Sequence, residues 1–105
     1  MSSRLEQLQQ MLLQEPHDEF LQYAIAIEYF SGGQNEKAIE MLEKMLHNNP
    51  GYLAAYYQLG KCYEVVNKMK EAATIYTKGI ELAQKQGKQK TLSELREALF
   101  LIDED

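Results

Sequence analysis

Apolar residues recur along most of the chain at intervals of three and four, the spacing that gathers side chains on one face of a helix. In the N-terminal segment this stripe consists of Leu5, Leu8, Met11 and Leu12. It predicts a helix over residues 2–14, which ends before Pro16 because proline lacks the backbone donor that a helix interior needs. Further helices are predicted over residues 18–30, 36–48, 52–66 and 69–86.

Polar and glycine-containing stretches separate these helices. Turns are expected over residues 31–34 and 67–68, and Gly87 is expected to stop the helix that precedes it. Asn35 is the predicted N-cap of the helix that follows the first turn. Thr91 and Glu94 read as a capping box that opens a last helix. The apolar face of that helix consists of Leu92, Leu95, Leu99 and Ile102.

Several positions 34 residues apart hold the same or similar residue types. The pairs are Pro16 and Pro50, Ala26 and Gly60, Tyr29 and Tyr63, Ala38 and Ala72, and Leu42 and Tyr76. The most regular stretch, residues 56–63, reads aromatic-x-x-Leu-Gly-x-x-Tyr, and Ala-x-x-x-aromatic follows at residues 72–76. This pattern and period resemble the signature of the tetratricopeptide repeat (TPR) family. Gln22, which corresponds to Tyr56, departs from the aromatic residue that the family prefers.

The resemblance implies an all-α fold, in which helical hairpins stack into a short right-handed superhelix with a capping helix at each end. The chain then forms a single TPR domain over residues 1–105. Its expected parts are an N-terminal half-repeat over 1–16, repeat one over 19–52, repeat two over 53–86 and a C-terminal capping helix over 88–105.

Small residues have a physical role at the helix crossings of such hairpins. Gly60 and Ala26 on the first helices, and Ala38 and Ala72 on the second helices, are expected to allow close approach of the two axes. Leu59, Tyr63 and Tyr76 are expected to fill the space on either side. Arg4 takes the place of the small residue in the N-terminal half-repeat. Arg96 takes the place of Gly60 if a third repeat begins at residue 89, and its long charged side chain is expected to forbid a close partner helix.

Composition narrows the range of partners. The 105 residues suffice for one domain, and the net charge of −5 with a pI near 5.0 argues against nucleic acid as a partner.

A single cysteine forms no intramolecular disulfide. No stretch is long and apolar enough to cross a membrane, and residues 1–15 do not resemble a secretory signal. The expected location is the cytoplasm.

Candidate catalytic groups are few, and the chain is not expected to be an enzyme. His17 and His47 fall at helix junctions, and Cys62 falls inside a predicted helix with no base placed beside it. Metal-binding Cys-x-x-Cys or His-x-x-x-His spacings and glycine-rich phosphate loops are absent from the sequence, so neither metal nor cofactor is expected. The carboxylates lie among lysines on polar helix faces.

The family resemblance implies instead that the first helices of successive repeats line a concave groove for a protein partner. The matching positions are Phe20, Tyr23, Ile27, Phe30 and Ser31 in repeat one, and Ala54, Tyr57, Lys61, Glu64 and Val65 in repeat two. The predicted function is therefore a non-catalytic protein-protein interaction module. Its partner would be a peptide, a helix or a whole protein that lies in an apolar and aromatic groove.

Two alternatives remain open at the level of sequence. The groove of Tyr23, Ile27 and Tyr57 could be buried against a second copy in a homodimer, or a small enzyme or ligand-binding site could use Cys62 or a pair of carboxylates. Chaperone-binding members of the family hold a C-terminal carboxylate with lysine and asparagine side chains. Tyr23, Ile27 and Gln58 occupy three of those positions here, so binding to chaperone tails is not expected.

Overall fold

The structure, a computed structural model, describes residues 3–102, and these residues form six helices and no strand. The helices are α1 (Ser3–Gln14), α2 (Glu19–Ser31), α3 (Asn35–Asn48), α4 (Ala54–Val65), α5 (Met69–Gln86) and α6 (Gln89–Ile102). The prediction of an all-α fold is confirmed. Helix α4 begins two residues later than predicted, after a turn that contains Tyr52 and Leu53.

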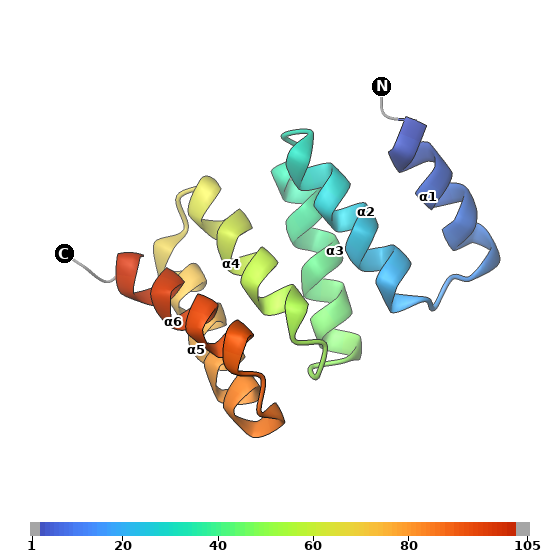
Figure 1. Cartoon of the computed structure of the whole chain (residues 1–105). Helices are drawn as coiled ribbons and strands as arrows, with labels where there is room; N and C mark the ends of the chain where they lie inside the picture. The colour runs from blue at the N-terminus through green and yellow to red at the C-terminus, as the bar shows by residue number, and fades with distance from the viewer. Residues whose placement is uncertain (1–2, 103–105) are drawn as a thin grey trace.

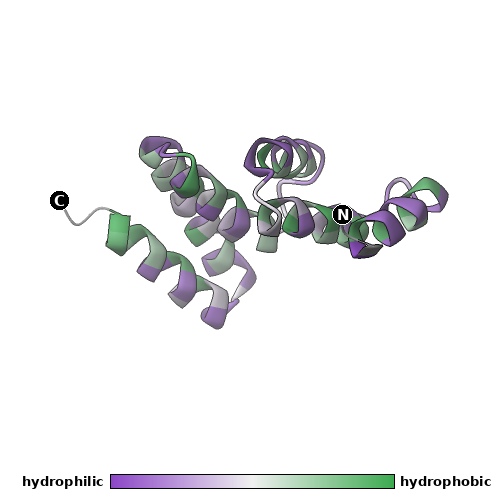
Figure 2. Cartoon of the chain, turned by 90° about the horizontal axis from the view of Figure 1, so that it is seen from above, coloured by the Kyte–Doolittle hydropathy of each residue, from purple (hydrophilic) through white to green (hydrophobic). Residues whose placement is uncertain are grey.

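Each helix packs against the next one along the chain, and α3 and α5 lie behind α2, α4 and α6 in the view of Figure 1. Hairpins α2–α3 and α4–α5 form the middle of the stack, and α2, α4 and α6 lie beside one another along one side of it. Seen from above in Figure 2, α1 and α6 are at opposite ends. The described residues form an elongated body of 41 × 28 × 21 Å. The right-handed sense of the stack remains a prediction from the family resemblance.

A hydrogen bond at the entry to each hairpin shows why both copies take the same path. The hydroxyl of Tyr56 donates to the Pro50 carbonyl oxygen at 2.6 Å, and Nε2 of Gln22 donates to the Pro16 carbonyl oxygen at 3.0 Å. Both donors and both acceptors are 34 residues apart. Gln22 thus differs from the aromatic residue in type but makes the equivalent bond.

The turn inside each hairpin is also repeated. Gly33 and Asn67 both have a left-handed backbone, with φ of 81° and 68°. The amides that follow, those of Gln34 and Lys68, each donate to the carbonyl of a tyrosine five residues earlier at 2.8 Å. The prediction that Asn35 is the N-cap of α3 is wrong. Asn35 is the first residue of the helix, because the chain enters it one residue earlier, through Gln34.

The predicted capping box at Thr91 is also wrong. Gly87 ends α5 in the left-handed conformation, with φ of 68°, and the chain reverses there within two residues. The Lys88 amide donates to the Ala83 carbonyl, and the Lys88 carbonyl accepts from the Leu92 amide. Helix α6 therefore begins at Gln89, and Thr91 lies inside its first turn.

The core confirms the predicted crossing of the helices. Ala26, Ala38 and Ala72 are buried, and a Cβ atom placed on Gly60 would lie 2.1 Å from Cε1 of Tyr76. One core cluster runs through α2 to α6, and a smaller one joins α1 to α2. The smaller cluster consists of Leu8, Leu21, Ala24 and Ile25. Full burial of each larger side chain contributes about 1.5–3 kcal/mol, which ties α1 to the end of the stack.

Candidate protein-binding groove

Two tyrosines at equivalent positions of neighbouring helices form the centre of the predicted groove. Tyr23 lies on α2 and Tyr57 on α4, and both side chains are half-buried. The ring centroid of Tyr23 is 5.7 Å from that of Tyr52, and the centroid of Tyr57 is 6.4 Å from that of Tyr76. Burial and the nearby Tyr52 raise the pKa of Tyr23. Each ring is thus supported by the core and has part of its surface open to a partner.

A positive charge lies directly beside the second of these rings. Nζ of Lys61 is 5.3 Å from the ring centroid of Tyr57, one helical turn earlier on α4. A cation at this distance from an aromatic face is attracted by the ring by about 0.5–1 kcal/mol at an exposed site. The contact holds the ammonium group of this half-buried lysine beside the tyrosine.

Glu64 has a structural partner that the sequence did not reveal. Its carboxylate accepts a hydrogen bond at 2.5 Å from the hydroxyl of Tyr76, a fully buried residue of α5. Burial and this bond raise the pKa of Tyr76. The hydroxyl of a buried tyrosine usually needs a hydrogen-bond partner. That need could have identified Glu64 as the acceptor for Tyr76.

The remaining groove positions of repeat one are spread over two surfaces. Ile27 and Phe30 are half-buried, and Phe30 also packs against the main core. Phe20 is 66% exposed and lies beside α1, where it lines a hollow together with Met11 of α1. Phe20 is thus part of the surface between α1 and α2, and its role in the groove stays a prediction. Other predicted groove positions, namely Ser31, Ala54 and Val65, are exposed.

Helix α6 carries two exposed apolar residues outside the predicted groove positions. Phe100 and Leu101 are 66% and 58% exposed. They are 36 residues beyond Glu64 and Val65, which corresponds to the late start of the third repeat at residue 89. The register of α6 could have predicted that these two residues are exposed. A capping helix, however, is expected to expose polar rather than apolar residues.

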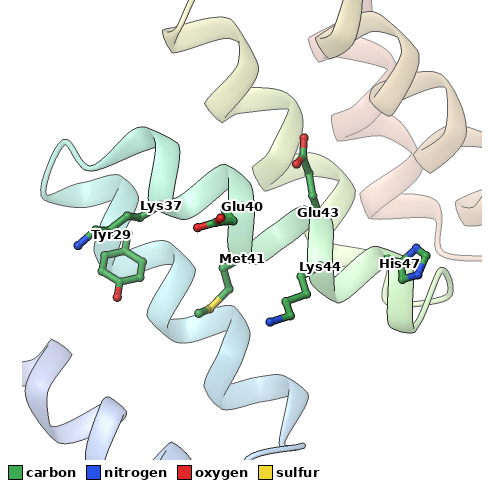
Figure 3. A pocket seen from close by; sticks show the side chains of 7 residues that line it. All are labelled: Tyr29, Lys37, Glu40, Met41, Glu43, Lys44 and His47. Carbon is green, nitrogen blue, oxygen red and sulfur yellow. The ribbon is translucent and has the colours of Figure 1, made fainter.

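Another hollow, of about 740 Å³, lies along α3 and is shown in Figure 3. Tyr29 reaches it from α2, and the other lining residues, on α3, are Lys37, Glu40, Met41, Glu43, Lys44 and His47. Nζ of Lys37 is 5.6 Å from the ring centroid of Tyr29, and Glu43 accepts a hydrogen bond from the Tyr63 hydroxyl. These contacts are typical of a solvated helix face with alternating charges.

Cys62 and the acidic side chains are the candidates for chemistry that the sequence leaves open. Within residues 3–102 no cluster of three His, Cys, Asp or Glu side chains could hold a metal ion. Cys62 is buried in α4, and burial raises the pKa of its thiol to about 11. The thiol is therefore protonated at neutral pH and packs as a small apolar residue. None of the six described helices is long and apolar enough to span a bilayer.

Comparison with known proteins identifies the same repeat that the hydrogen bonds and turns indicate. Residues 29–95 match the model of the tetratricopeptide repeat. The chain belongs to the tetratricopeptide repeat family. TPR domains generally mediate protein-protein interactions and are typically non-catalytic.

Solved structures share this architecture. A TPR domain from Salinibacter ruber is 37% identical, with a TM-score of 0.79 over 83% of this chain and 88% of its own. A protein from Bordetella parapertussis is 26% identical, with a TM-score of 0.87 over 99% of this chain and 90% of its own. The uncharacterised protein ycf37 of Pyropia yezoensis is 39% identical over 54 residues, which cover 51% of this chain and only 30% of that protein.

Proposed function

We propose that this TPR domain is an interaction module in which the groove between α2 and α4 binds an apolar segment of a partner protein. The observation that carries the proposal is the pair of half-buried rings, Tyr23 and Tyr57, at equivalent positions of adjacent first helices. Tyrosines of this kind offer a large contact area and lose little side-chain entropy on binding. The acidic net charge of −5 favours a protein over nucleic acid as the partner.

The chemistry around the rings describes the partner in more detail. Ile27 and Phe30 continue the apolar surface along α2, and Lys61 adds a cation beside Tyr57. Glu64 is engaged by Tyr76 and is therefore assigned to the scaffold. A segment that fits this groove has apolar side chains for the rings and a carboxylate or carbonyl oxygen within reach of Lys61.

Affinity capture from cell lysate with two groove variants tests the proposal. Tyr23→Ser/Tyr57→Ser removes both rings and, because the rings also touch the core, lowers the melting temperature as well. Ile27→Lys/Lys61→Glu instead changes polarity and charge without removing either ring. Both variants are expected to lose the captured protein. Leu13→Ser, which removes an exposed apolar side chain on α1, is the matched control and is expected to retain it.

The outcomes separate this proposal from its rivals. Capture that persists in the folded Ile27→Lys/Lys61→Glu variant would contradict a binding role for the groove. If wild-type protein shows twice its 12.2 kDa mass in light scattering and this variant does not, the groove binds a second copy. Rapid reaction of Cys62 with a thiol reagent in the folded protein would favour the ligand-binding or enzyme alternative.

A further inference from the structure

The two ends of the stack are opposite halves of one hairpin. Of the helices described, α1 packs only against α2, in the way that α3 packs against α4. Nε2 of Gln9 donates to the Tyr29 hydroxyl at 3.2 Å, and 34 residues later Glu43 accepts from the Tyr63 hydroxyl. Helix α1 therefore takes the place of a second helix whose first helix is not among the described residues.

Helix α6 has the complementary position. Leu92, Leu95 and Ala98 are buried, as are Tyr56, Leu59 and Cys62 of α4, each 36 residues earlier. Helix α6 also packs against α5 and α4 in the way that α4 packs against α3 and α2. It therefore takes the place of a first helix whose second helix is not among the described residues.

Both ends expose apolar side chains on the side where the other half of the hairpin would lie. Between α1 and α2 there is an open hollow of about 690 Å³ that is lined by Leu8 and Leu21 and by the more exposed Met11 and Phe20. On α6, Phe100 takes the position of Glu64, which on α4 contacts the second helix of its own hairpin through Tyr76. One end thus accepts a first helix, and the other end offers one.

An arginine lies at the crossing position of each end. Within the hairpins this position holds Ala26 or Gly60 on the first helix and Ala38 or Ala72 on the second, and all four are buried. The corresponding residues are Arg96 on α6 and Arg4 on α1, and both are exposed. The side chain of Arg4 is 64% exposed, and its Nε is 3.2 Å from the Glu28 carboxylate.

We propose that Arg4 and Arg96 keep copies of this chain from joining head to tail. If α6 of one copy entered the hollow between α1 and α2 of the next, the two arginines would meet where the hairpins allow only a small side chain. Their size would hold the helices apart, because the equivalent crossings inside the hairpins are filled by a small side chain on each helix. The occupant excluded is a second copy, because the two ends are halves of the same interface that the chain forms twice within itself.

The test is to give the ends the residues that repeat one uses. Arg4→Ala/Arg96→Ala places the pair found at Ala38 and Ala26 in the two end helices, and alanine favours the helix at both exposed sites. A head-to-tail interface does not close on itself, so the mass of this variant is expected to rise continuously with concentration beyond that of a dimer. Wild-type protein is expected to remain at 12.2 kDa in the same light-scattering series.

Two further variants make the result decisive. Arg4→Lys/Arg96→Lys keeps long cations at both positions and is expected to stay monomeric. Met11→Arg, added to the alanine pair, places a charge in the hollow and is expected to restore the monomer. The proposal is overturned if the folded alanine pair has the mass of the wild type, or if the lysine pair polymerises. It is equally overturned if the polymer persists with Met11→Arg but is lost with Tyr23→Ser/Tyr57→Ser, since the groove would then be the contact.

Discussion

Repeats one and two solve the same packing problem with different pairs of residues. In repeat one, Ala26 on the first helix faces a second helix that carries Leu42, and in repeat two Gly60 faces Tyr76. Leu42 and Tyr76 are 1% and 0% exposed, so neither crossing has room to spare. Ala26 has a methyl group opposite Leu42, whereas Gly60 has none opposite the larger ring of Tyr76. The residue at one side of a crossing is therefore set by the residue at the other.

The largest expected effect comes from breaking this match in repeat two. In Gly60→Ala, the new methyl group would lie 2.1 Å from Cε1 of Tyr76, although the same residue is native in repeat one. Overpacking of this kind costs about 1–3 kcal/mol of the free energy of unfolding. Urea denaturation measures the loss. A Gly60→Ala variant as stable as the wild type would show that the two helices separate without cost.

The matched control exchanges both residues of the crossing. Gly60→Ala/Tyr76→Leu recreates the pair of repeat one and is expected to be more stable than Gly60→Ala alone. Because Tyr76→Leu by itself leaves a cavity and an unbonded Glu64, the two changes are expected to be strongly non-additive. Additive losses in the double-mutant cycle would contradict the proposed match.

Alkaline pH sharpens the same comparison, because position 76 titrates and position 42 does not. Burial and the bond to Glu64 raise the pKa of Tyr76, whereas a tyrosine in the unfolded chain ionises near its ordinary value of about 10. The contribution of Tyr76 to stability is complete well below pH 10 and declines as the pH rises through the unfolded pKa of about 10. Its share of the slope grows over this range toward a limit of about 1.4 kcal/mol per pH unit. Urea midpoints between about pH 9 and about pH 11 should fall less steeply in Tyr76→Phe than in the wild type.

A second variant for the pH series is Tyr63→Phe. Burial and the bond to Glu43 raise the pKa of Tyr63 as well, so this variant is also expected to flatten the slope. Both repeats have a tyrosine at this position, Tyr29 in repeat one and Tyr63 in repeat two, whereas Tyr76 corresponds to Leu42. Equal slopes in all three proteins would mean that neither hydroxyl stays protonated while the chain is folded.

Much of this fold could be predicted from spacing alone, whereas the neighbours of the candidate groove residues could not. The period of 34 and the small residues at Gly60 and Ala72 identify both hairpins, because helix crossings leave a direct trace in residue size. The family resemblance places Glu64 and Phe20 in the groove by their register in the repeat. Register gives the face of a side chain but not its neighbours, and those depend on Tyr76 and on α1. The helix start at Thr91 was wrong because the tightness of a glycine turn is not visible in a capping pattern.

A smaller effect is expected where the two repeats make the same bond with different donors. Tyr56→Phe removes the hydroxyl that donates to the Pro50 carbonyl from a buried ring, and it should cost about 1 kcal/mol. Gln22→Met removes the equivalent amide from an exposed bond to Pro16 and should cost less, since water replaces it. Thermal melting of the two variants measures the difference. A larger loss in Gln22→Met would reverse this ranking of the two entry bonds.

The smallest effect is expected at the turns, where Gly33 and Asn67 have the same left-handed backbone. A residue with a side chain adopts this conformation at a cost in free energy, and the cost is smaller for asparagine than for most residues. Asn67→Gly should therefore stabilise the protein by about 0.5 kcal/mol, which raises the melting temperature by about 2–4 °C. Gly33→Asn should lower it by a similar amount, because a Cβ atom at Gly33 has no neighbour within 4 Å and meets only backbone strain. The exchanged variant, Gly33→Asn/Asn67→Gly, should melt with the wild type. If it melts well below the wild type, the two turns are not equivalent, and the asparagine in repeat two makes contacts that backbone conformation alone does not explain.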